Sequence, residues 1–115
     1  MKLFTVEERK NELKAELDRI TGIIIDKYCP EKIVLFGSFA ENNIHEWSDI
    51  DLLIIKDTPQ RPVDRSLELF RLIHPKVGID LFIYTPDEIN ALHKERYAFL
   101  LHILENGKVL YEKRN

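Results

Sequence analysis

The sequence predicts a small α/β (α+β) domain in which helices cover a mixed sheet. Apolar residues recur at helical spacing over residues 5–28 and 85–106, which indicates an amphipathic helix near each end of the chain. Short runs between these helices are too uniformly apolar to leave one face in water, so we expect buried strands. The expected order is helix, strand, strand, helix, strand, helix, followed by a short edge strand.

The first helix is expected to begin at Thr5, because Thr5 and Glu8 have the spacing of a capping box. The apolar residues that follow share one narrow helical face: Val6, Leu13, Leu17, Ile20 and Ile24. Cys29 precedes Pro30 and ends the helix, since the residue before a proline avoids helical geometry.

Four segments are expected to be strands. Residues 33–36, 49–55 and 77–84 are short apolar runs rich in β-branched residues, and 108–111 has the pattern of an edge strand. Two prolines within 56–62 indicate a loop after the second strand.

Two further helices are expected in the second half of the chain. The apolar face of a short one consists of Val63, Leu67 and Phe70. The last begins with a capping sequence at 85–88 and runs unbroken to Asn106-Gly107. Its apolar face is unusually wide and includes Ile89, Leu92, Tyr97, Phe99, Leu100, Leu101, Ile103 and Leu104. This width indicates either burial between the sheet and the first helix or a partner surface, such as a homodimer contact.

The composition excludes several classes of protein. The 115 residues predict one domain, 1–115. A formal net charge of −3 without a basic stripe argues against general nucleic-acid binding. No apolar run is long enough to span a membrane. The single cysteine excludes an internal disulfide, and together with the polar N-terminus it predicts a cytoplasmic protein.

Three aspartates stand in strands that are otherwise apolar. Asp49 and Asp51 are two residues apart, so their side chains point to the same face of their strand, and Asp80 interrupts a later strand. Carboxylates in such places repel one another and are costly to desolvate unless something compensates them. If the two strands are neighbours, the three acids could hold two Mg²⁺ ions about 3.5–4 Å apart. Taken singly, each aspartate could instead be a cap, or Asp80 could pair with Lys32 or Lys56.

Gly37-Ser38 directly follows the first buried strand. A glycine there lets the main chain approach a ligand closely, and amides with a serine hydroxyl can bind phosphate. A simple turn is the alternative. Trp47, just before Asp49, could stack on a nucleobase or pack over the sheet edge.

These motifs and their spacing resemble the signature of the polymerase-β-like nucleotidyltransferase superfamily. The signature consists of Gly37-Ser38, ten further residues, Asp49-x-Asp51 and the later Asp80. The length and the strings around both motifs resemble its minimal nucleotidyltransferase (MNT) domains, typically antitoxins paired with a HEPN ribonuclease toxin. The resemblance covers nearly the whole chain and implies the polymerase-β-like nucleotidyltransferase fold.

The resemblance also implies roles for these residues. Gly37 and Ser38 would hold the nucleotide triphosphate, and Asp49 and Asp51 would ligate Mg²⁺. Asp80 would ligate the catalytic metal and help to deprotonate the attacking hydroxyl. ATP would supply AMP to a hydroxyl of a cognate HEPN toxin, with loss of pyrophosphate.

The chain departs from this family pattern in one place. Many minimal members have Arg-Gly where this chain has Glu41-Asn42. Lys56 or Arg61 could supply the missing positive charge. Two other functions stay open: an antitoxin that neutralises its partner by binding alone, and a small-molecule nucleotidyltransferase.

Overall fold

The computed structural model describes residues 5–45 and 48–114. Its elements are α1 (Val6–Ile23), the π-helix η1 (Ile24–Tyr28), β1 (Lys32–Phe36), α2 (Gly37–Ala40), β2 (Ile50–Ile55), α3 (Pro62–Ile73), β3 (Ile79–Tyr84), α4 (Pro86–Lys94), α5 (Ala98–Asn106) and β4 (Lys108–Glu112). The predicted α/β class and the edge strand are confirmed. Trp47 lies outside the described residues, so its two predicted roles stay predictions.

The four strands form one mixed sheet in the order β3-β2-β1-β4. β1 pairs antiparallel with both β2 and β4, whereas β2 and β3 are parallel. The parallel pair requires a crossover, which α3 provides. The condition on which the aspartate prediction depended, that the second and third strands are neighbours, is therefore met.

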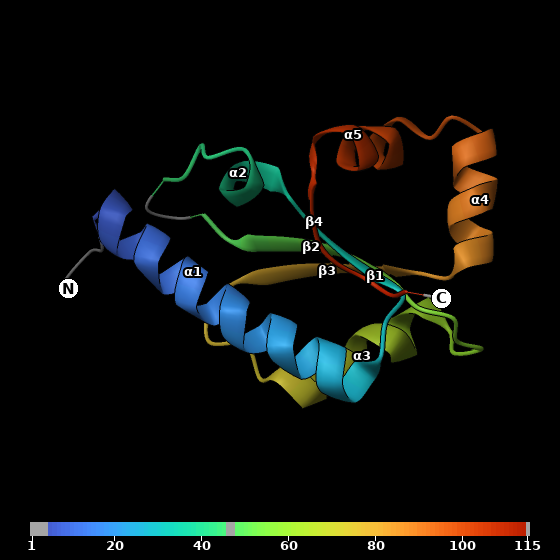
Figure 1. Cartoon of the computed structure of the whole chain (residues 1–115), viewed down its shortest axis with the longest axis horizontal. Coiled ribbons are helices and arrows are strands. Elements are labelled where there is room, and N and C mark those ends of the chain that lie inside the picture. Colours follow the sequence, from blue (N-terminus) through green and yellow to red (C-terminus); the bar gives the residue numbers. More distant parts are fainter. Residues whose placement is uncertain (1–4, 46–47, 115) are drawn as a thin grey trace.

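Helices cover both faces of this sheet. Figure 1 shows α1 and α3 on one side of the sheet and α4 and α5 on the other. The α1 side contains the larger core, which includes Leu13, Leu17, Ile20, Ile24, Ile33, Leu35, Leu52, Ile54, Leu69 and Ile73. The α5 side contains Val34, Leu53, Leu100 and Ile103. Alternate residues of β1 and β2 thus enter opposite cores, as continuously apolar strands require.

The first helix was predicted closely. The Thr5–Glu8 capping box is present, and the predicted apolar face is buried apart from Val6. Cys29 ends the π-helical turn in the left-handed conformation, with φ of 52°. In the part of the chain that the structure describes, no helix is both long and apolar enough to cross a membrane.

The prediction of one continuous last helix was wrong. The helix ends at Lys94 and restarts at Ala98, and Arg96 between them has a left-handed φ of 54°. A straight helix over 86–106 would be about 31 Å long, whereas the strands of this sheet have five or six residues and such strands span about 17–20 Å. The break folds the second half back over the sheet. α5 also lies on the face opposite α1, so it is not buried between the sheet and the first helix as one interpretation expected.

The face of α3 was also predicted wrongly. The stripe expected to be its apolar face is exposed, with Val63 58%, Leu67 47% and Phe70 36% accessible. The helix instead buries Leu69, Ile73 and the charged Arg65.

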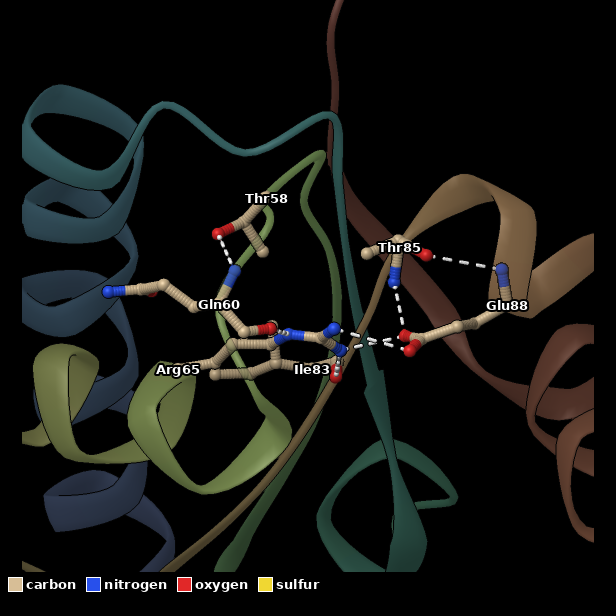
Figure 2. A network of polar contacts seen from close by, with 6 residues as sticks. All are labelled: Thr58, Gln60, Arg65, Ile83, Thr85 and Glu88. Atoms are coloured by element: carbon tan, nitrogen blue, oxygen red, sulfur yellow. Dashed lines mark hydrogen bonds and ion pairs between the residues drawn. The ribbon is translucent and has the colours of Figure 1, made fainter.

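Arg65 is buried because it joins three segments, as Figure 2 shows. Its guanidinium donates to the main-chain carbonyls of Gln60 and Ile83 at 2.8 and 3.1 Å. It also forms a two-point ion pair with Glu88, at 2.7 and 3.2 Å. This hydrogen bonding with Arg65 lowers the pKa of Glu88, which is also part of the Thr85 capping box. The arginine thereby fastens α3 to the end of β3 and the start of α4.

Candidate active site

The predicted site residues lie at the sheet edge where β1 ends and where β2 and β3 begin. Phe36, the last residue of β1, pairs with Asp51 of β2. On its other side Asp51 pairs with Asp80 of β3. Gly37 follows Phe36 directly, so three elements distant in the sequence bring Gly37-Ser38, Asp51 and Asp80 together.

Gly37 is required at this edge for two reasons. Its φ of +80° lies in the left-handed region, which side chains other than glycine rarely adopt. A Cβ at this position would also overlap the carboxylate of Asp51. The main chain at Gly37 therefore lies directly against an acidic side chain, while its predicted close approach to a ligand stays a prediction.

Asp51 and Asp80 are cross-strand neighbours, so their carboxyl groups lie on the same face of the sheet. Burial is the largest cause that raises the pKa of Asp51, to about 7, and the hydrogen bond and charge of Asp80 and the charge of Asp49 raise it further. Asp80 itself is exposed. Removal from water and the neighbouring acids thus both disfavour the charged form of Asp51.

Asp49 lies just outside β2, and its side chain is 48% exposed. A Cβ on Gly78 would overlap the Asp49 carboxylate, so this glycine makes room for it just before β3. Asp49 Oδ1 also lies 3.6 Å from a guanidinium nitrogen of Arg9 on α1. Asp49 therefore faces an arginine and a glycine, whereas Asp51 faces Asp80 and Gly37.

Ser38 is connected to the segment before Asp49. Its hydroxyl lies 3.1 Å from the hydroxyl of Ser48, which is buried and also accepts from the His45 amide at 2.9 Å. Arg9 Nε donates to the Ser48 carbonyl at 3.0 Å. These bonds hold the Gly-Ser and Asp-x-Asp motifs in one relative position.

The donor set suits a hard divalent cation, although its ligands are not preassembled. Within residues 5–45 and 48–114, no group of three His, Cys, Asp or Glu side chains is arranged to hold a metal ion. The structure places Asp51 beside Asp80 on neighbouring strands, but Asp49 lies beside Arg9. Carboxylate oxygens are nevertheless the ligands that Mg²⁺ prefers, so the residues fit such an ion. Their roles as ligands and in catalysis stay predictions.

The structure also clarifies the departure at Glu41-Asn42. Asn42 has a left-handed φ of 55°, a conformation that glycine and asparagine both enter readily. The change from glycine therefore preserves the local backbone, and the change to Glu41 is the one that alters charge. Neither predicted substitute is close: Lys56 donates to the Tyr28 carbonyl at 2.6 Å, and Arg61 pairs with Asp64.

Sequence reasoning missed three residues of this site: Arg9, Ser48 and Gly78. Ser48 immediately precedes Asp49, and Gly78 immediately precedes β3, so their positions in the sequence could have indicated that they belong to the site. Arg9 lies on a different element and carried no signal, because only folding brings it to Asp49. The suggested partners of Asp80 are engaged elsewhere, with Lys32 4.0 Å from Glu112.

The chain is similar to known proteins in both sequence and fold. The family described as "Polymerase beta, Nucleotidyltransferase" matches residues 18–115. Two proteins of Methanocaldococcus jannaschii, both named "putative protein adenylyltransferase", are similar in sequence. One is 35% identical over 81 residues, covering 70% of this chain and 78% of that protein. The other is 31% identical over 112 residues, covering 85% and 76%.

A solved structure supports the fold. It is described as a "putative nucleotidyltransferase" from Sulfolobus solfataricus and superimposes with a TM-score of 0.67. The match covers 97% of this chain and 91% of that one, at 17% identity. The match in sequence, the fold and the positions of the glycine and aspartates lead to one conclusion: the chain belongs to the polymerase-β nucleotidyltransferase family and is a nucleotidyltransferase.

Proposed function

We propose that this chain is a Mg²⁺-dependent protein adenylyltransferase that transfers AMP from ATP to a hydroxyl of a partner protein. The observation that carries this proposal is the position of Asp51, which lies against Gly37 and pairs with Asp80 across the sheet. This proximity supports the proposal because a glycine main chain can bind phosphate and carboxylates can bind a divalent cation. Two parts of the proposal, the transfer of AMP and a protein as acceptor, rest on the names of the similar proteins.

Each site residue has a chemical task in this proposal. Asp49, Asp51 and Asp80 would hold the cation, which would offset the charge that develops on the transferred phosphate. The backbone at Gly37 and the Ser38 hydroxyl would hold the β- and γ-phosphates. Arg9 would help to position Asp49 through their contact at 3.6 Å.

The reaction balances as follows. The acceptor oxygen forms a bond to the α-phosphorus, and the bond from this phosphorus to the bridging oxygen breaks. Pyrophosphate leaves with that electron pair, and Asp80 takes the hydroxyl proton. Holding the acceptor and the phosphate in line supplies much of the rate enhancement in such transfers.

The proposed acceptor is a HEPN-type ribonuclease toxin, which makes this chain its cytoplasmic antitoxin. This part of the proposal rests on the resemblance of the motifs to minimal nucleotidyltransferase domains. The small size of the chain also supports a protein partner, because a single domain leaves little surface for an acceptor pocket of its own. A complex of the two proteins would then be the working unit.

The test combines the purified chain, the product of the adjacent gene, α-labelled ATP and Mg²⁺. We expect label on the partner, located by mass spectrometry, and no label with the D49N/D51N variant. Asp57→Asn is the matched control, since this exposed aspartate follows the opposite end of β2. Absence of label from a partner that the D49N/D51N variant still silences would contradict transfer and identify an antitoxin that acts by binding alone.

A further inference from the structure

We propose that an aromatic cluster beside the carboxylates is the surface on which the nucleobase of the nucleotide stacks. The cluster consists of Phe36, Phe82, Tyr97 and Phe99. The inference rests on the proposed function, because it assigns the base-binding part of the same site. Phe36 directly precedes the Gly37-Ser38 motif, whereas Phe82, Tyr97 and Phe99 lie outside the residues that carry the family resemblance.

The cluster lies next to the paired aspartates on the same face of the sheet. Phe36 is the cross-strand partner of Asp51, and Phe82 follows Asp80 by two residues, about 7 Å along the strand. The Phe99 ring from α5 lies 5.8 Å from that of Phe36 and 5.2 Å from that of Phe82. Phe99 therefore spans the sheet immediately beside the carboxylates.

The order of groups along this face matches the order of groups in a nucleoside triphosphate. Gly37-Ser38 lies beyond the end of β1, at the sheet edge. Asp51, Asp80 and Phe36 come next at one level, and Phe82 lies two residues further in on β3. The Phe99 ring of α5 lies against the rings of both Phe36 and Phe82. A triphosphate placed on Gly37-Ser38 with its α-phosphate at the aspartates directs its nucleoside towards the rings.

Aromatic surface is left accessible in this cluster, although the residues beside it in α5 are buried. Tyr97 is 45% and Phe99 37% exposed, whereas Leu100 and Ile103 of the same segment are each 1% exposed. The Tyr97 and Phe99 rings meet at 6.2 Å in an edge-on arrangement. Accessible aromatic rings beside a phosphate-binding edge are typical stacking partners of nucleobases.

The break between α4 and α5 produces this surface. Arg96 adopts φ of 54°, a left-handed conformation that is unfavourable for arginine, and Tyr97 follows as the residue that caps α5. Without the break, α5 would not return over the carboxylate end of the sheet. Strained backbone of this kind is concentrated at functional sites in proteins.

The test compares two ligands by calorimetry, both with Mg²⁺: ATP, and tripolyphosphate, which lacks the nucleoside. We expect Phe99→Ala and Tyr97→Ala to weaken ATP binding by about 5- to 150-fold, the range of a lost base-stacking contact. Binding of tripolyphosphate should not change. Phe70→Ala is the matched control, because Phe70 is 36% exposed and lies on α3, across the sheet.

If wild type binds both ligands and Phe99→Ala binds ATP unchanged, the stacking surface is wrong while the proposed function stands. If in addition transfer to the partner is lost, the cluster receives the acceptor instead of the base. If wild type binds neither ligand, both proposals fail. Phe99→Leu keeps apolar packing without the ring, so it replaces Phe99→Ala if circular dichroism shows that Phe99→Ala does not fold.

Discussion

Replacing Gly37 with alanine tests the contact between the main chain and Asp51. Alanine at this position either keeps φ near +80° or moves the chain, at a cost of about 1–2 kcal/mol. Its Cβ would also overlap the Asp51 carboxylate, and such overpacking typically costs about 1–3 kcal/mol. We therefore expect Gly37→Ala to lower the free energy of unfolding by about 2–5 kcal/mol and to lower Tm by about 8–20 °C.

A double-mutant cycle separates these two contributions. Asp51→Ala removes the carboxylate and leaves Cβ, which would lie 3.4 Å from the new methyl group, an ordinary contact. In the Asp51→Ala background, Gly37→Ala should therefore cost only the backbone contribution, about 1–2 kcal/mol. The difference between the two backgrounds measures the overlap itself.

The assay is urea unfolding followed by far-ultraviolet circular dichroism, with EDTA present to remove divalent cations. Gly22→Ala is the matched control, since Gly22 lies in α1 and a Cβ added there would have nothing within 4 Å. The free energy of unfolding of this variant should rise by about 0.5–1 kcal/mol, because alanine is more favourable than glycine inside a helix. The reasoning is refuted if Gly37→Ala is as stable as wild type, or if its cost is the same with and without the Asp51 carboxylate.

Three further predictions concern charge. The pKa of Asp51 rises from 3.8 to about 7 on folding, so without divalent cations the free energy of unfolding should fall as the pH rises between these values, and Asp51→Asn should flatten that slope in urea titrations. Arg9→Gln removes the contact with Asp49 and should reduce AMP transfer in the labelling assay by about tenfold or more, while Arg61→Gln, which alters an exposed ion pair, leaves it unchanged. Arg65→Ala should lower the free energy of unfolding by about 2–4 kcal/mol in the same denaturation assay, because Glu88 and two carbonyls lose their partner. A loss below about 1 kcal/mol would contradict the role assigned to this network.

Local signals were sufficient for much of the fold. The capping boxes at Thr5 and Thr85 fixed two helix starts, because they depend only on residues three positions apart. Uniformly apolar strands predicted a sheet covered on both faces. The aspartates were conspicuous for the same reason, since a carboxylate in an apolar strand needs an explanation.

The features that sequence reasoning missed depend on contacts between distant segments. The segment 95–97 contains neither glycine nor proline, so the sequence carried no local signal for a helix break there. The face of α3 was misjudged because hydrophobicity alone ranks Phe70 above Arg65, whereas Arg65 is buried through carbonyls supplied by other elements. Arg9 reaches Asp49 only through the packing of α1 against the sheet.

The parallel pairing of β2 with β3 makes the site sensitive to strand register. Asp51 and Asp80 face each other because Ile50 pairs with Ile79, and successive residues of a strand point to opposite faces. Moving β3 by one residue would send the Asp80 side chain into the α1-side core and bring an isoleucine or leucine beside Asp51. An insertion or deletion in the connection at 74–78 that moves β3 by one residue against β2 would therefore separate the two acids and disable the site.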